Sequence, residues 1–166
     1  MAAVPPMDEV AKSSREERLA RLARTADELA TAIAGQPESV LARRPDAKNW
    51  AAKEVVCHLR DAEEAFMGRF QLIAAIQEPK LPGADADRLA EERQYLRNDA
   101  TVALGHFRRR REETLAYLRD LSAEGWQRGG IHPVRGRLTV NDLLSLMAWH
   151  DLNHLDQLRR AFRGEA

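Results

Sequence analysis

The sequence predicts an all-α protein, an antiparallel four-helix bundle with a long connection before the last helix. Four long segments repeat their apolar residues at spacings of three and four, which is the period of an amphipathic helix. No segment shows sustained strand-like alternation, and aromatic residues make up only 5% of the chain, too few for a typical β-sandwich. Amphipathic helices of this length bury their apolar faces against one another, which favours a bundle.

The first helix is expected to begin at Ser13 or Ser14, because glutamates follow three residues later in a capping-box arrangement. Gly35 and Pro37 end it. The stretch 37–45 leaves room for a short helical turn, but its two prolines make it a connector. The apolar stripe of the helix consists of Leu19, Leu22, Ala23, Ala26, Leu29, Ala30 and Ile33.

The second helix is expected to run from Asn49 or Trp50 to about Gln77. A loop over 79–87 then leads to a third helix, which is expected to be continuous over 88–121. The buried stripe of the second helix consists of Val55, Leu59, Ala62, Phe66, Phe70 and Ile73. Both segments are long enough to span a bundle.

Four consecutive arginines, residues 108–111, lie in the third helix and are followed by two glutamates. Helical geometry spreads consecutive side chains around the axis, and the glutamates offer partners three and four residues away. We therefore expect an ion-paired helix surface here and no anion-binding patch.

The connection over 122–138 is longer than a bundle turn requires, and loops of this length often carry function or cross the end of a bundle. Thr139 is expected to cap the last helix, with Asp142 at its third position complementing the helix N-terminus. One face of this helix consists of Leu143, Met147, His150, His154, Leu158 and Ala161.

Residues 13–163 are expected to form one bundle domain, and residues 1–12 a flexible lead-in. Lysine and arginine number 26 and are balanced by 26 acidic residues, so the chain lacks the basic footprint of a nucleic-acid binder. No stretch is apolar enough to span a bilayer, and the N-terminus does not resemble a secretory signal. One cysteine, Cys57, excludes an intramolecular disulfide. We expect a cytoplasmic protein that binds neither nucleic acid nor membrane.

The last helix contains the segment WHDLNHLDQ, in which His150 and His154 are four residues apart and share the apolar stripe. This spacing stacks two imidazoles on one helix face, close enough to bind one metal ion. His58 lies near the apolar side of the second helix and is a candidate third ligand. Three imidazoles would leave open positions for water or substrate, as in a catalytic metal site. The alternative is that the histidines are packed core residues, since periodicity alone does not show that His58 meets the pair.

The segments NWAAKEVVCHLRDAEEAF and GRLTVNDLLSLMAWHDLNHLDQLRR resemble the DinB-like (DNA-damage-inducible, YfiT/DinB) superfamily. The matching residues are Trp50, Glu54, His58, Asp61, Thr139, Leu143, His150, Asp151, His154 and Gln157. The resemblance extends from the first helix to Phe162. It implies a four-helix bundle, often dimeric, in which three histidines hold a divalent metal. Carried over position by position, those ligands fall on His58, His150 and His154.

The resemblance also implies a range of activities, from metal-dependent hydrolysis to transfer reactions that use bacillithiol or mycothiol. We therefore expect a homodimeric enzyme acting on a small molecule, with thiol S-transfer placed narrowly ahead of hydrolysis by analogy. The metal is expected to be zinc or nickel before iron or manganese, with a low-molecular-weight thiol as an optional co-substrate. Two alternatives stay open: a non-catalytic stress-response protein that holds a metal or ligand, and a structural bundle with packed histidines.

Other polar residues have simpler interpretations. Cys57 neighbours His58 but points about 100° away on a helix, so we expect a small buried hydrophobe rather than a reactive thiol. Asp61 and Glu54 each lie one turn from His58 and are candidates to orient it, with Asp61 preferred because of the family match. His132 is expected on a surface loop and is not counted as a ligand.

Overall fold

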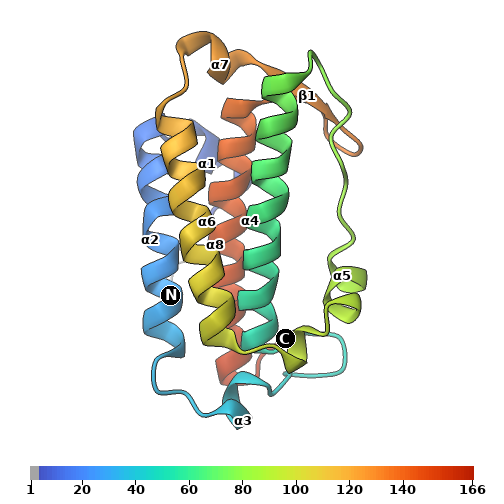
Figure 1. The fold of residues 1–166 in the computed structure, drawn as a ribbon. Helices are drawn as coiled ribbons and strands as arrows, with labels where there is room; N and C mark the ends of the chain where they lie inside the picture. The colour runs from blue at the N-terminus through green and yellow to red at the C-terminus, as the bar shows by residue number, and fades with distance from the viewer. Residues whose placement is uncertain (1–3) are drawn as a thin grey trace.

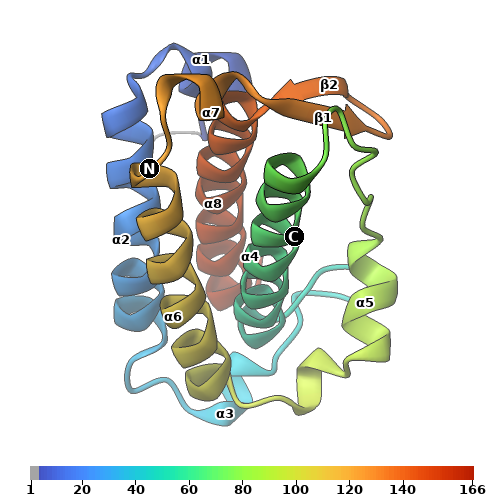
Figure 2. The same cartoon turned by 45° about the horizontal axis from the view of Figure 1, so that its top comes forward.

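Four long helices lie side by side in the computed structural model, which describes residues 4–166 (Figure 1). They are α2 (Arg15–Ile33), α4 (Ala52–Ala75), α6 (Ala100–Arg119) and α8 (Val140–Arg163). Each packs against two neighbours, in the ring order α2, α6, α4, α8. The prediction of a four-helix bundle is confirmed. One detail differs from the antiparallel arrangement that was predicted, because the neighbouring helices α4 and α6 run in the same direction along the bundle (Figures 1 and 2).

This shared direction results from the connection between α4 and α6, which returns along the full length of the bundle (Figure 1). The connection contains α5 (Ala86–Glu92) and a 3-10 turn, η1 (Tyr95–Arg97). The prediction of one continuous helix over 88–121 is therefore wrong. Gln94 interrupts it with a φ of 49°, and Asp99 starts α6 afresh by accepting a hydrogen bond from the Val102 backbone at 2.8 Å.

The caps that the sequence suggested are present at two helix starts. Ser14 and Glu17 form a reciprocal capping box at α2, and Thr139 forms one with Asp142 at α8. Gly164 ends α8 with a φ of 72°, in the left-handed region that favours glycine. Thr139 and Gly164 thus fix the two ends of α8, the helix that carries His150 and His154.

The connection before α8, expected as a long loop over 122–138, contains regular secondary structure. It holds α7 (Ala123–Gln127) and a hairpin of β1 (Gly129–His132) and β2 (Gly136–Thr139), with Gly129 opposite Thr139 (Figure 2). The connection after α4 runs beside β1, where the Ile131 backbone bonds to Pro79 at 2.8 Å and to Leu81 at 2.9 Å. The hairpin and this segment thus hold each other over one end of the bundle.

Two further short helices, α1 (Met7–Lys12) and α3 (Glu38–Leu41), precede α2 and α4. The segment expected as a flexible lead-in contains α1, which packs against α8, and residues 1–3 lie outside the described residues. The proline-bounded connector contains the expected turn, α3. Within residues 4–166, no helix is long and apolar enough to cross a membrane.

A layer of buried charge divides the core into two apolar clusters. Arg111, only 3% exposed, pairs with Glu63 at 2.7 Å and with Asp151 at 2.6 Å, and Thr25 donates to the same aspartate. The expectation that the four arginines of 108–111 share a solvated surface is therefore wrong for Arg111. A helix that packs on both α2 and α4 turns one of four consecutive residues inward.

Candidate metal centre

Three imidazoles meet where α4 faces α8, and they belong to the three histidines that the sequence singled out. His58 comes from α4, and His150 and His154 lie one turn apart on α8. One ring nitrogen from each histidine lies within 4.8 Å of those of the other two, and the Nε2 atoms of His58 and His150 are 3.0 Å apart. The structure thus brings together residues 92 positions apart in the chain, which periodicity alone could not show.

The three side chains fit a divalent metal ion. Two nitrogens bound tetrahedrally at about 2.05 Å lie roughly 3.3 Å apart, close to the separation between His58 and His150. An all-imidazole donor set suits zinc, nickel, iron or copper. Three protein ligands leave further coordination positions open, as in catalytic sites.

Burial keeps the imidazoles in the neutral form that binds metals. The pKa of His58 falls to about 3, chiefly through burial and then through the charge of His154, against an opposing effect of Asp61. Burial also lowers the pKa of His150 far below its ordinary value, and the two other imidazoles lower it further. The pKa of His154 is lowered by burial more than Gln157 and Asp151 raise it. At neutral pH the cluster therefore holds unprotonated nitrogens.

Neighbouring side chains orient the rings. Gln157, one turn beyond His154, places its Oε1 atom 2.7 Å from His154 Nδ1. Trp50 lies nearly parallel to the His154 ring, at 16° and 6.4 Å, and its own ring is 4.9 Å from that of His58. Phe66 meets His150 edge-on at 5.9 Å. The orienting role of these three residues was not predicted, although the spacing of three between His154 and Gln157 is a signal for it in the sequence.

Asp61 has other partners than the one expected. Its carboxylate accepts from the Tyr95 hydroxyl at 2.6 Å and from Arg60 Nε at 2.7 Å, and Arg93 lies 3.0 Å away. No hydrogen bond joins Asp61 to His58 in the described chain. Burial opposes its ionisation, but the bonds from Arg60 and Tyr95 hold the pKa of Asp61 below its usual range. Two of these partners lie in the connection that was expected to be helix, so the sequence did not reveal them.

The alternative candidate to orient His58 also has other partners. Glu54 pairs bidentately with Arg44, at 2.6 and 2.7 Å, and accepts from the Ala51 backbone at 2.9 Å. It therefore ties the start of α4 to the connector before it. Neither carboxylate that the sequence analysis considered is hydrogen-bonded to a histidine of the cluster in residues 4–166.

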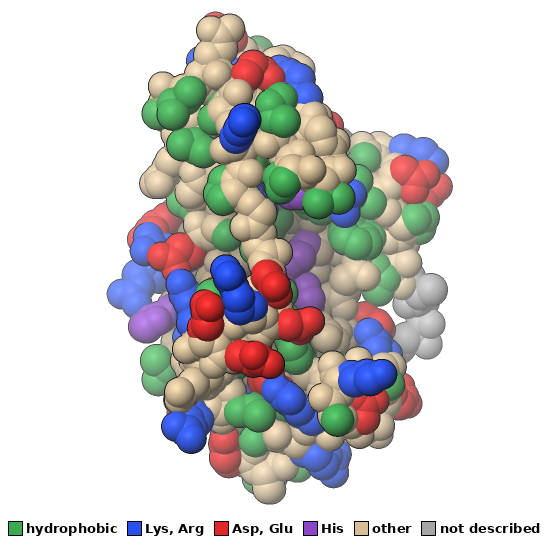
Figure 3. Space-filling view, turned by 90° about the vertical axis from the view of Figure 1, so that its right-hand side faces the viewer, with side chains coloured by type: hydrophobic (Ala, Val, Ile, Leu, Met, Phe, Trp, Pro, Cys, Tyr) green, Lys and Arg blue, Asp and Glu red, His purple; other side chains and the backbone are tan. Residues whose placement is uncertain are grey.

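A cavity of about 410 Å³ opens onto the three histidines. Figure 3 shows histidine side chains deep in a hollow on the face that carries α5. The walls are mainly apolar and consist of Trp50, Phe66, Leu89, Leu146 and Trp149. Two segments, 82–86 and 132–135, are called the roof below, and the residues of them that line the cavity are Gly83, Ala84, Ala86 and 132–135. The cavity has the size and lining of a small-molecule site.

His132 belongs to this cavity, although the sequence analysis expected it on a surface loop. Its Nδ1 accepts from the backbone amides of Val134 and Arg135, at 3.2 and 3.3 Å, so its own proton lies on Nε2. Burial lowers the pKa of His132, and the charges of Arg69 and Arg135 lower it further. It is therefore a neutral donor in the roof.

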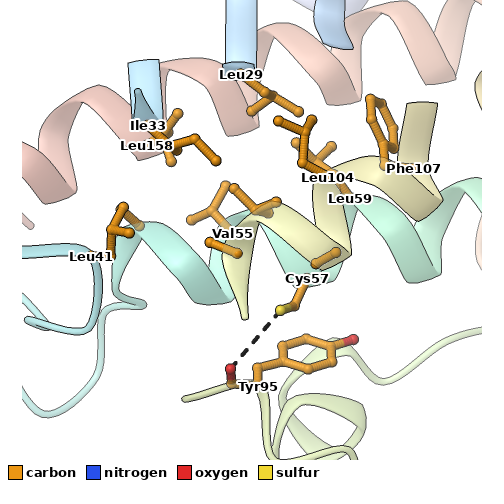
Figure 4. Packing of buried hydrophobic residues seen from close by; sticks show 14 of the residues in the cluster. Leu29, Ile33, Leu41, Val55, Cys57, Leu59, Tyr95, Leu104, Phe107 and Leu158 are labelled. Carbon is orange, nitrogen blue, oxygen red and sulfur yellow. Dashed lines mark hydrogen bonds between the residues drawn. The ribbon is translucent and has the colours of Figure 1, made fainter. Parts of the chain in front are cut away.

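Cys57 lies apart from the imidazole cluster, as expected. Figure 4 shows its side chain on the side of α4 that faces Tyr95, with Sγ 3.9 Å from the carbonyl oxygen of Tyr95. Burial raises the pKa of this thiol to about 11. It is a packing residue in this fold.

Comparison with known proteins adds a family and a fold. The family model described as the DinB superfamily matches residues 5–158. A protein of Oceanobacillus iheyensis, named as a candidate metal-dependent hydrolase, is 26% identical over 106 residues, which are 64% of this chain. The match spans 61% of that relative, less than two thirds of its length. The structure of YfiT from Bacillus subtilis, described as a probable metal-dependent hydrolase with an unusual four-helix bundle topology, superimposes with a TM-score of 0.84. It is 23% identical and the match covers 93% of this chain and 92% of that one.

Proposed function

Because this chain belongs to the DinB superfamily, we propose that it is a metal-dependent hydrolase of a small molecule, with a divalent ion held by His58, His150 and His154. The observation that carries the proposal is the convergence of three neutral imidazoles at the base of a cavity. Packed histidines need hydrogen-bond partners, yet these three face one another, and a shared ion would satisfy their lone pairs.

When bound, such an ion acts as a Lewis acid and makes a hydrolytic nucleophile available at neutral pH. The chain's own residues supply the rest. Gln157 holds the His154 proton at Nδ1, so that Nε2 keeps its lone pair. Trp50, Phe66 and Trp149 exclude water and offer apolar surface to the body of a substrate. His132 holds a proton at Nε2 in the roof.

We prefer hydrolysis to thiol S-transfer as the reaction class, although the sequence alone had placed S-transfer narrowly ahead. One relative described above is named as a candidate metal-dependent hydrolase, and the other is described as a probable one. Thiol S-transfer and non-catalytic metal or ligand binding are kept as outcomes of the test. The homodimer, the cytoplasmic location, the thiol co-substrate and the absence of nucleic-acid partners stay predictions.

A screen of chromogenic esters and amides, with and without a low-molecular-weight thiol, tests the proposal. We expect turnover by the zinc-loaded protein without thiol, loss of turnover after chelation and in His154→Ala, and unchanged turnover in His106→Ala. His106 is an exposed histidine on α6 outside the cavity, so it is a matched control. Turnover that requires the thiol would indicate S-transfer, and metal binding without turnover would indicate a binding protein.

A further inference from the structure

Arg69 is a buried cation on the cavity side of α4. Its side chain is 7% exposed, and its guanidinium lies 5.2 Å from the centre of the Phe66 ring. No carboxylate lies within 4.0 Å of it in the described part of the chain. The buried Arg111 differs, because two carboxylates compensate its charge. A buried guanidinium without an anion is costly, which calls for an explanation.

The hydrogen bonds of Arg69 leave part of its guanidinium available. Nε and Nη2 both donate to the carbonyl oxygen of Pro82, at 3.2 and 3.0 Å. Nη1 has no hydrogen-bond partner among residues 4–166. Arg69 is a lining residue of the cavity that contains the three histidines, so a ligand in this cavity can supply the missing acceptor.

The rest of the cavity adds positive rather than negative charge. Arg135 lies in the roof and has no acidic partner within residues 4–166. Asp61 is the one carboxylate among the described lining residues, and it is already bonded to Tyr95 and Arg60. The unpaired charge that faces a ligand is therefore cationic, and a divalent ion on the histidines would increase it.

We propose, resting on the proposed function, that Arg69 binds the carboxylate of a small amphipathic substrate whose reacting group lies at the histidines. Arg69 and His150 both lie against the Phe66 ring, with the guanidinium 5.2 Å and the imidazole 5.9 Å from its centre, so both groups border the same ring of the cavity wall. The apolar walls take the body of such a molecule. One uncompensated guanidinium with one free nitrogen matches a carboxylate monoanion better than a phosphate dianion.

A structural alternative is that Arg69 only ties the roof to α4 through Pro82. Arg128 provides the comparison, because it also donates to backbone carbonyls, those of Ile73 and Ala74 at 3.0 and 3.3 Å. Arg128 does not line the cavity. Substitution of either arginine removes ties to a backbone segment, but only the loss of Arg69 removes a cation from the site.

Calorimetric titration with 3-phenylpropanoate and with the uncharged 3-phenylpropanamide tests the proposal on metal-free and on zinc-loaded protein. We expect both forms of the wild type to bind the acid at least about tenfold more tightly than the amide. Arg69→Gln should remove this preference at unchanged zinc content and thermal stability. Arg69→Lys should keep part of it, and Arg128→Gln should keep all of it.

The proposal would be overturned if wild type did not bind the acid at millimolar concentration, bound acid and amide with equal affinity, or bound phenyl phosphate, titrated as a third probe, more tightly than the acid. A preference that survives in Arg69→Gln would overturn it too. A preference seen only with zinc would place the carboxylate on the metal and also overturn it. If Arg69→Gln does not fold, two other results test the proposal: the relative affinity of the metal-free wild type for acid and amide, and the same comparison in Arg69→Lys. Absence of zinc binding would overturn the proposed hydrolase while leaving the carboxylate preference of the metal-free protein measurable.

Discussion

His154 Nδ1 lies 2.7 Å from Oε1 of Gln157, one turn further along α8. Assigned as the acceptor, the amide oxygen fixes the imidazole proton at Nδ1 and turns the lone pair of Nε2 toward the other two histidines. The same helix thus supplies two candidate ligands and the residue that orients one of them. Residues that orient ligands in this way contribute to metal affinity without touching the ion.

Gln157→Ala should weaken zinc binding by about 10- to 100-fold and leave the fold intact. Titration against a chromogenic chelator measures the affinity. Asp156→Ala is the matched control, since this neighbouring residue pairs with Arg160 and does not line the cavity. Equal affinity in wild type and Gln157→Ala would show that the hydrogen bond has no orienting role.

Arg111→Met should destabilise the protein by about 3–5 kcal/mol, because it leaves Glu63 and Asp151 buried without their cation. Arg110→Met, one position earlier, removes an exposed pair with Glu113 and should cost less than about 1 kcal/mol. Urea unfolding of both variants measures the difference. Similar free energies of unfolding for the two variants would contradict the structural role of the buried layer.

Cys57 should resist thiol reagents in the folded protein. Burial raises its pKa to about 11, so the thiolate is scarce at pH 8, and the side chain is inaccessible. Reaction with Ellman's reagent should be slow in buffer and complete in denaturant. Fast reaction in buffer at pH 8 would place the thiol in a different environment.

The metal-free protein should lose stability as the pH falls below about 6.5. The three clustered histidines have pKa values lowered by burial, so the unfolded state binds more protons than the folded state in this range. The contribution of the three neutral imidazoles to folding stability is fully present above the pKa that histidine has in the unfolded state. It is lost as the pH falls toward the pKa of each histidine in the folded state, which is about 3 for His58. Each histidine then costs up to about 1.4 kcal/mol per pH unit.

Urea unfolding at pH 7.5 and 5.5 checks this expectation. His154→Ala should reduce the difference in the free energy of unfolding between the two pH values, because it removes one of the buried imidazoles. A free energy of unfolding that is equal at both pH values in the metal-free wild type would contradict the burial of neutral imidazoles.

The sequence predicted correctly the helices that have both a capping residue at their start and a continuous apolar stripe along one face. Ser14 and Thr139 cap α2 and α8 as expected, and the spacing of His150 and His154 predicted a shared face. The break before α6 was missed, because Gln94 in a left-handed conformation carries no strong signal in the sequence. The hairpin was missed because its strands are too short for a clear alternation.

The candidate site could be predicted in part. The three histidines followed from helical spacing and from the family resemblance, but the meeting of His58 with the pair depends on how α4 packs on α8. Two of the three partners of Asp61, Tyr95 and Arg93, come from a segment with no long-range signal in its sequence. Arg69 carries no motif at all, and its role follows only from its burial in the cavity wall.

The most direct test of the metal centre is elemental analysis of tag-free protein beside His150→Ala, His154→Ala and the control His106→Ala. We expect about one divalent ion per chain in wild type and in the control, and loss of the ion in both cluster variants. Wild-type protein that takes up no metal after addition of zinc, nickel or manganese would contradict the account, as would unchanged metal content in the two cluster variants.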